Sequence, residues 1–88
     1  MIRRRVVVHG LVQGVFFRDT VTQRAQSRRL AGWVRNNRDG TVEAVFEGER
    51  EAVESLVRFV HEGPRGARVD RVELHEEEPE GLAGFRIA

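Results

Sequence analysis

The 88-residue chain contains no cysteine and no lysine, so all 15 of its basic residues are arginines. Without cysteine it has no disulfide, no thiolate nucleophile and no thiolate metal ligand. Without lysine it has neither the phosphate-binding lysine of a Walker-type loop nor a Schiff-base lysine. No apolar run approaches the roughly 20 residues that a membrane-spanning helix needs. Arginine therefore remains as the side chain best suited to hold an anion.

The composition is that of one small globular domain, which we expect to comprise residues 1–88. Apolar residues make up 40% of the chain and charged residues 33%, which is too apolar for a disordered tail. Arg3-Arg4-Arg5 is followed only by Val6–Val8 before His9, which is too short for the apolar part of a signal peptide. We therefore expect a cytoplasmic monomer that binds no membrane. The net charge of +1 and the alternating signs also predict no nucleic-acid partner.

Hydrophobic periodicity and turn residues divide the chain into seven elements. Phe17, Val21 and Ala25 recur four residues apart, as on one face of a helix, and Asp39-Gly40 is typical of a hairpin turn. The patterns predict strands over residues 4–9, 33–36, 41–47, 69–76 and 85–87, and helices over residues 18–29 and 48–62. This order predicts an α+β, ferredoxin-like βαββαβ sandwich, in which two helices cover one face of an antiparallel sheet and a short C-terminal strand follows.

The segment Gly10–Arg18 has the features of a phosphate site. A strand leads into a loop bracketed by Gly10 and Gly14, and a helix begins where the loop ends. Successive backbone N–H groups in such a loop converge on an anion, and the helix N-terminus adds partial positive charge. Arg18 stands at the rim, where its planar guanidinium can hold two phosphate oxygens. The same pattern also fits a plain connection followed by a solvated arginine.

Asn36 is the second candidate, because it ends a predicted strand just before the turn. Taken alone it is more typical of a turn-forming asparagine, although Asn37 could serve the turn in its place. Ser27 and Ser55 lie within predicted helices with no histidine at a motif spacing, so no nucleophile elbow is present. Electrostatic catalysis on a phosphate, without a covalent intermediate, is the chemistry that remains.

The other titratable residues favour neither a metal nor a cofactor. His9, His61 and His75 fall on different predicted elements, with no pair at a metal-binding spacing. The acidic run Glu76–Glu78 is typical of a solvated face, and Asp19 suits the negative charge that a helix start favours. We expect no metal and no cofactor.

Two motifs resemble those of the acylphosphatase family. Gly10–Arg18, with its Val-Gln-Gly-Val-Phe-Phe-Arg core, resembles the phosphate-binding motif, and Gly32-Trp-Val-Arg-Asn36 resembles the second motif. Further similarities follow in the same order, at Asp39–Val42, Gly63-Pro64 and Gly84–Ile87. The resemblance covers essentially the whole chain.

The resemblance implies a metal-free enzyme that hydrolyses the carboxyl-phosphate bond of small acyl phosphates. It implies that Arg18 binds the phosphoryl group and that Asn36 orients the attacking water. It also implies a phosphate-binding loop formed by Gln13, Gly14, Val15, Phe16, Phe17 and Arg18. Asn37 stands where some family members carry threonine.

Two other functions remain compatible with the predicted fold. A non-catalytic phosphate- or RNA-binding module is one, but RNA binding on this fold needs exposed aromatic residues on a basic sheet face. The predicted strand Thr41–Glu47 offers one aromatic residue and two acids. The other is a regulatory domain of the kind found in larger hydrogenase-maturation enzymes.

Overall fold

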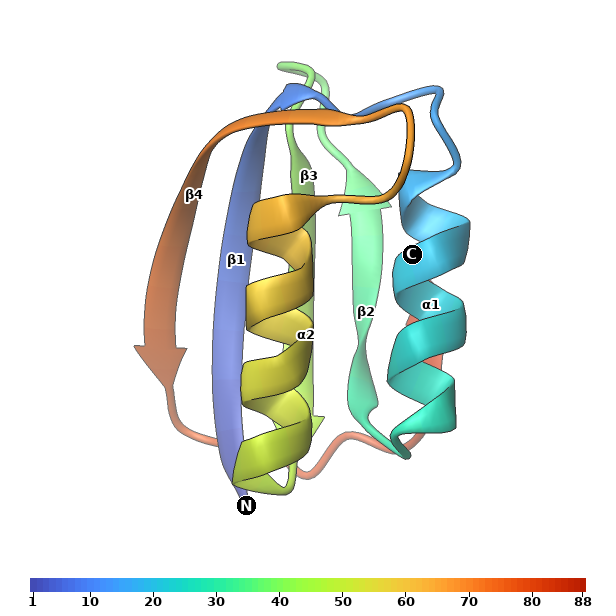
Figure 1. Ribbon diagram of the computed structural model, residues 1–88. Coiled ribbons are helices and arrows are strands. Elements are labelled where there is room, and N and C mark those ends of the chain that lie inside the picture. The colour runs from blue at the N-terminus through green and yellow to red at the C-terminus, as the bar shows by residue number, and fades with distance from the viewer.

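The computed structural model describes all 88 residues, and its elements follow the predicted order. Each predicted element is present, with its ends shifted by at most two residues. Neither helix is long and apolar enough to cross a membrane. The chain runs through β1 (Ile2–Leu11), α1 (Phe17–Ser27), β2 (Ala31–Asn36), β3 (Val42–Gly48), α2 (Arg50–Glu62), β4 (Arg68–Glu77) and β5 (Phe85–Ile87) (Figure 1).

The five strands form one sheet in the order β4-β1-β3-β2-β5. The first four are antiparallel to their neighbours, as predicted. The short strand β5 lies parallel to β2, with Gly32 opposite Phe85, so the complete sheet is mixed and not wholly antiparallel. β4 ends at the end of the sheet where β2 begins, and the chain crosses there before it enters β5 in the direction of β2 (Figure 1).

The pairing of β1 and of β2 with the central strand β3 ends at the same residue of β3. Val42, the first residue of β3, is paired with Val8 of β1 on one side and with Asn36 of β2 on the other. β1 and β2 therefore run in the same direction and end at the same end of the sheet. This register brings the loop after β1 and the turn after β2 to the same end of the molecule.

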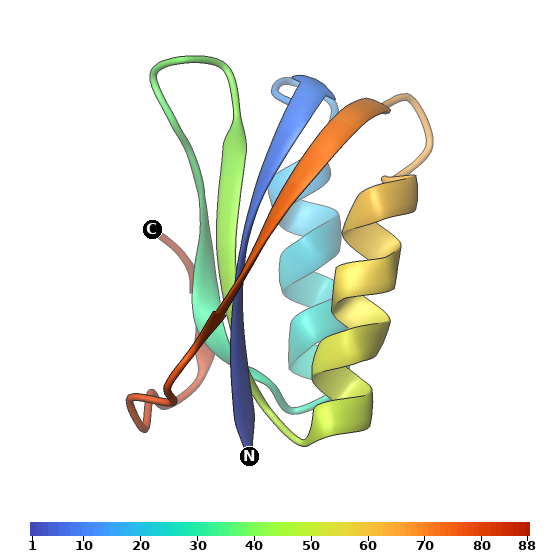
Figure 2. The same cartoon turned by 90° about the vertical axis from the view of Figure 1, so that its left-hand side faces the viewer.

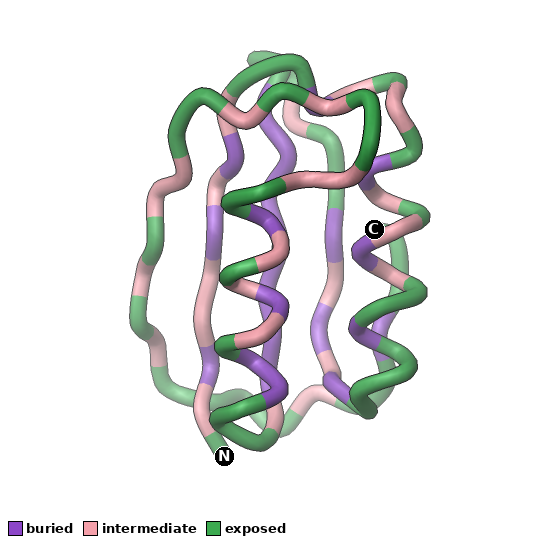
Figure 3. Tube along the Cα trace, in the orientation of Figure 1, coloured by how far each residue is buried: buried purple, intermediate pink, exposed green.

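Both helices pack on one face of the sheet (Figure 2). Phe17, Val21 and Ala25 are the buried residues of α1, as the four-residue spacing predicted. The buried positions of each helix lie along one side of it and the exposed positions along the other (Figure 3). α2 contributes the buried residues Ala52, Val53, Leu56 and Val60. One cluster of 16 buried apolar residues fills the space between helices and sheet.

The opposite face of the sheet carries ion pairs and the loop 78–84 instead of a helix (Figure 2). Arg3 is buried there: its Nη1 donates to Glu47 at 2.7 Å and its Nε donates to Glu77 at 2.8 Å. The prediction of a solvated acidic run is therefore wrong for Glu77, which pairs with Arg5 as well. Glu47 also accepts hydrogen bonds from three backbone N–H groups of the loop, those of Glu80, Gly81 and Leu82 (2.8, 3.1 and 3.1 Å).

The partners of the Glu47 carboxylate determine its pKa. Burial by itself raises the pKa of Glu47, but the hydrogen bonds from the Glu80 backbone N–H and from Arg3 outweigh burial and lower the pKa below its ordinary value of 4.5. Arg5 and then Arg3 lower the pKa of Glu77 in the same way. Both carboxylates are therefore more stable as anions in the folded protein than in the unfolded chain.

Replacing Glu47 by alanine is expected to lower the free energy of unfolding by about 3–5 kcal/mol, because Arg3 would stay buried without its partner. Urea denaturation of the purified variant measures this loss. Glu54→Ala is the matched control. Glu54 is exposed and its ion pair with Arg50 is long, at 4.0 Å, so its removal should cost about 0.5 kcal/mol or less. Equal costs for the two variants would show that Glu47 is not a structural anchor.

Acid is expected to destabilise the protein through the same carboxylates. Since their pKa values are lowered by folding, their contribution is fully present above the unfolded value of about 4.5 and is lost as the pH falls through the folded values. Denaturation at a series of pH values from about 7 to about 3 measures the slope. Glu47→Gln should flatten that slope, and an unchanged slope would contradict this assignment.

Candidate active site

The loop that follows β1 leaves the sheet at a glycine. The pairing of β1 with β4 shifts between His9 and Gly10. A Cβ on Gly10 would lie 2.0 Å from the carbonyl oxygen of Arg68, and its φ of +135° disfavours any other residue. This close approach ends the regular pairing and directs residues 12–16 toward the start of α1.

The backbone of residues 12–16 is suited to bind an anion. Gly14 and Phe16 have positive φ angles of 76° and 58°, and such alternation turns successive N–H groups toward one point. None of the backbone hydrogen bonds in the connecting segments is donated by residues 12–16. The first bond of α1 runs from the Thr20 N–H to the Phe16 carbonyl at 3.1 Å, so the N–H groups that open the helix are also free of backbone acceptors.

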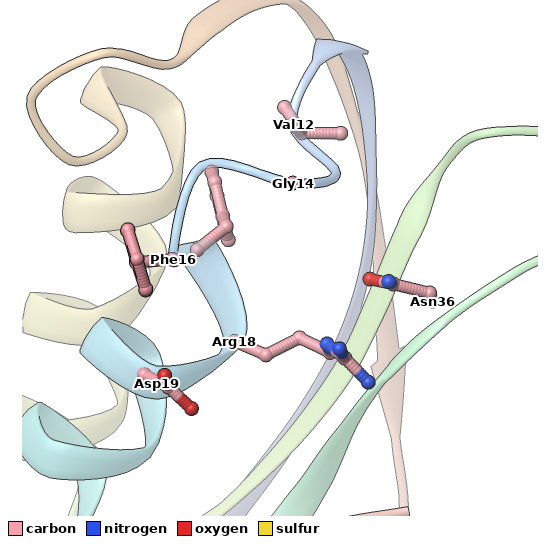
Figure 4. A pocket seen from close by; sticks show the side chains of 7 residues that line it. Val12, Gly14, Phe16, Arg18, Asp19 and Asn36 are labelled. Atoms are coloured by element: carbon pink, nitrogen blue, oxygen red, sulfur yellow. The ribbon is translucent and has the colours of Figure 1, made fainter.

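Arg18 and Asn36 lie at the same pocket although they are 18 positions apart in the sequence. Arg18 extends from the first turn of α1 toward the β2–β3 hairpin, and the Asn36 amide points from the end of β2 toward the loop (Figure 4). The pocket has a volume of about 250 Å³, enough for a phosphoryl group. It is lined by Val12, Gly14, Phe16, Phe17, Arg18, Asp19 and Asn36.

Arg18 differs from the other arginines because it is half-buried and yet lacks a protein partner, whereas the other arginines without one, Arg29, Arg38, Arg58, Arg65 and Arg86, are all exposed. The Arg18 guanidinium takes part in no ion pair or hydrogen bond, and neither does the Asn36 amide, whereas no buried polar side-chain atom in the protein is left unpaired. Seven other arginines pair with carboxylates: Arg3, Arg4, Arg5, Arg35, Arg50, Arg68 and Arg71. An unpaired arginine beside unpaired N–H groups leaves its donors available to a ligand.

Most residues of the predicted loop line the pocket, but two do not. The side chain of Val15 packs against the hydrophobic core. The side-chain amide of Gln13 donates to two backbone carbonyls of the β2–β3 turn. Sequence reasoning missed Val12 as a lining residue and assigned Asp19 to the helix start. Asp19 does lie in the first turn of α1, and its side chain points away from Asn36 (Figure 4).

The turn that follows Asn36 is held by a network of polar side chains. Asn37 donates from Nδ2 to Thr41 Oγ1 at 3.0 Å and to Glu43 at 3.2 Å. The Thr41 hydroxyl donates to Asp39 at 2.6 Å, which lowers the pKa of Asp39. Burial raises the pKa of Glu43, but hydrogen bonds from Arg35 and Asn37 outweigh it and the pKa is lowered. Asn37, which stands where some acylphosphatases carry threonine, thus makes structural contacts through its side-chain amide.

The histidines take part in local contacts outside the pocket. His9 Nε2 lies 2.6 Å from a carboxylate oxygen of Glu73, and His75 lies 3.8 Å from the same side chain. His61 bonds to the carbonyl of Val57, one turn earlier in α2, at 2.9 Å. None of the three lines the pocket.

Comparisons with known proteins agree on one family. The Acylphosphatase family model matches residues 4–87. An acylphosphatase of Rubrobacter xylanophilus is 58% identical over 86 residues, which cover 97% of this chain and 78% of that protein. One of Thermococcus kodakarensis is 51% identical, covering 98% of this chain and 94% of its own. The crystal structure of acylphosphatase from Bacillus subtilis matches with a TM-score of 0.95 at 40% identity, covering 100% of this chain and 99% of that chain.

Fold and comparisons together place the chain among the enzymes built on a ferredoxin-like α+β sandwich. Within that class the chain belongs to the acylphosphatase family, and it hydrolyses acyl phosphates. Nothing favours the alternative of a non-catalytic binding module. RNA binding would need a basic sheet face. On the face opposite the helices, Arg3, Arg5 and Arg35 are paired with the carboxylates of Glu43, Glu47 and Glu77.

Gly14→Ala is expected to weaken binding of inorganic phosphate about 5–30-fold, because a left-handed conformation costs a residue with a Cβ about 1–2 kcal/mol. A Cβ at Gly14 meets nothing within 4 Å, so the effect comes from the backbone alone. Isothermal titration with phosphate measures it. Gly66→Ala is the matched control: Gly66 also has a positive φ and open space around it, but it lies outside the pocket. If both variants bound phosphate equally well, the Gly14 conformation would not matter for the anion.

Proposed function

We propose that Arg18 and the backbone N–H groups of the loop bind the phosphoryl group of the substrate, and that Asn36 orients the attacking water. The observation that supports this is one pocket of about 250 Å³ that is lined by Arg18, by Asn36 and by loop residues whose N–H groups have no backbone acceptor. The loop residues that we assign to phosphate binding are Gln13, Gly14, Val15, Phe16, Phe17 and Arg18, with Gln13 and Val15 acting through their backbone.

The proposed phosphate site combines two kinds of donor. The guanidinium of Arg18 supplies a permanent positive charge and can donate two parallel hydrogen bonds to phosphate oxygens. The N–H groups between Gly14 and Arg18 and the dipole of α1 supply further partial positive charge. Because these groups are already in place before the reaction, they stabilise charge on the equatorial oxygens without reorganisation.

Asn36 suits a role in positioning water. Its amide carries both donors and an acceptor, so it can hold a water molecule in a defined orientation, but it has no basicity with which to take a proton. The amide points toward the loop from the end of β2 (Figure 4). Holding the nucleophile near the phosphorus in this way lowers the entropic part of the barrier.

The proposed hydrolysis needs neither a basic side chain nor a metal. The water oxygen forms a bond to phosphorus while the bond between phosphorus and the acyl oxygen breaks, and the carboxylate leaves with the electron pair. A carboxylate is a stable anion, so it needs no proton to depart. The proton lost by the water passes to an oxygen of the phosphate itself, and the products are a carboxylate and inorganic phosphate.

Release of phosphate from an aryl acyl phosphate, measured in EDTA, tests these roles. Arg18→Ala is expected to lower kcat/KM by at least about 10²–10³-fold and to weaken inhibition by phosphate, because a positioned donor is lost. Asn36→Ala is expected to lower kcat while phosphate inhibits as in the wild type. The matched control is Arg58→Ala, which removes an exposed arginine of α2 outside the pocket and should leave kcat/KM unchanged.

Two outcomes would contradict the assignment. If Asn36→Ala lost phosphate inhibition and kept its turnover, the roles of the two side chains would be wrong. If EDTA abolished turnover of the wild-type protein and added metal restored it, the metal-free mechanism would fail.

We also infer that the enzyme is a single-domain cytoplasmic monomer that acts on small molecules. The exposed strand β4 at one edge of the sheet is rich in charged residues, which disfavours edge-to-edge pairing. The large exposed apolar side chains belong to different parts of the chain: Met1, Leu11 at the end of β1, Phe16 in the loop, Leu74 of β4 and Ile87 of β5. Charged acyl phosphates do not cross a membrane unaided, so we expect the enzyme that hydrolyses them to be in the same compartment in which they form. Sedimentation at the mass of one 10.1 kDa chain and cell fractionation test these two points.

A further inference from the structure

The side chain of Gln13 joins the phosphate loop to the hairpin that carries Asn36. Its Nε2 donates to the carbonyl oxygen of Asn37 at 2.8 Å and to that of Thr41 at 2.9 Å. No other hydrogen bond connects residues 12–16 with residues 37–41. The two segments of the candidate active site are thus linked directly by a single amide.

The two carbonyls that accept these bonds are the ones that close the turn. The Asn37 N–H donates to the Thr41 carbonyl at 2.8 Å, and the Gly40 N–H donates to the Asn37 carbonyl at 3.2 Å. Asn37 and Thr41 are further joined by their side chains at 3.0 Å. Because Asn36 directly precedes this closed turn, a displacement of the turn relative to the loop would move Asn36 as well.

We propose that Gln13 is a positioning residue of the hydrolysis, which sets the placement of the Asn36 amide against the phosphate loop. This inference rests on the proposed roles of the loop and of Asn36. Gln13 acts through its side chain on the hairpin, while its backbone belongs to the loop. A displacement of about 1 Å between a bound nucleophile and its target can cost on the order of 10²-fold in rate, so one connecting amide can matter for turnover.

Glutamine suits this position because its NH2 group offers two donors on one atom. Each of the two carbonyls receives one of them, and Gln13 is half-buried, so competition from water is reduced. A glutamate has the same shape but, when ionised, carries only acceptors, and it would face two carbonyl oxygens. Methionine keeps most of the volume and removes the hydrogen bonds.

A double-mutant cycle with Gln13→Met and Asn36→Ala tests the proposal, with an aryl acyl phosphate as substrate. Gln13→Met alone is expected to lower kcat about 10–100-fold, while KM and inhibition by phosphate change by less than about threefold, because phosphate is held within the loop itself. In the Asn36→Ala background, Gln13→Met should lower kcat by less than about twofold, since the group that it positions is gone. Gln13→Glu should lose at least as much kcat as Gln13→Met.

The matched control is Gln26→Met. Gln26 of α1 also donates its amide to a backbone carbonyl of another element, that of Phe85 in β5 at 3.1 Å, but it lies outside the pocket. Gln26 is exposed and makes one bond where Gln13 makes two, so its replacement should lower stability by less than Gln13→Met does and leave kcat within about twofold of the wild type. Urea denaturation of every variant identifies the conditions under which all are folded. If Gln13→Met does not fold, Gln13→Asn takes its place in the cycle, because the shorter side chain keeps a neutral amide but withdraws it from the two carbonyls.

The outcomes separate this inference from the function on which it rests. If Asn36→Ala lowers kcat and Gln13→Met lowers it by the same factor with and without Asn36, the two effects are independent and the positioning role is wrong. If Gln13→Met instead weakens phosphate inhibition as strongly as it lowers kcat, Gln13 serves the phosphate site and not Asn36. If Asn36→Ala keeps full kcat, the proposed role of Asn36 fails, and the role of Gln13 fails with it.

Discussion

The antiparallel pairing of β3 with both β1 and β2 is the constraint on which the site depends. Val42 is paired with Val8 on one side and with Asn36 on the other. Since the pairing of β1 and of β2 with β3 ends at the same residue, Val42, the loop after β1 and the turn after β2 lie at the same end of the sheet. A slip of one residue in either pairing would turn the side chains of that strand to the other face and would displace one half of the pocket from the other.

The two faces of the sheet are covered by different kinds of interaction. On one face, the apolar stripes of α1 and α2 bury a cluster of valines, leucines and phenylalanines. On the other, arginines and carboxylates pair across β4, β1, β3 and β2, and Glu47 accepts hydrogen bonds from the loop 78–84. Carboxylates inside the fold are tolerated because each has several donors. Among the buried and half-buried arginines, Arg18 is the one without a partner, and it lines the same pocket as Asn36.

Much of the fold could be predicted from local pattern. The four-residue spacing of Phe17, Val21 and Ala25, the alternation along β3 and the Asp39-Gly40 turn each depend on near neighbours in the chain. The direction of β5 could not be predicted, because a three-residue strand has no pattern that distinguishes parallel from antiparallel pairing. The burial of Arg3 and Glu47 was also missed, since each is accommodated only by partners far away in the sequence.

The sequence by itself determined the order of the elements and the glycine-bracketed loop, because these follow from residue type and short spacing. Residue type alone left Arg18 and Asn36 undecided between a site and an ordinary connection and turn, and the family resemblance selected them. Tertiary structure alone decided that Arg18 and Asn36 share a pocket and that the Gln13 side chain turns to the hairpin. The physical reason is that strand register sets both arrangements. Strand register depends on many contacts between segments that are distant in the sequence, so it cannot be predicted from any single segment of the chain.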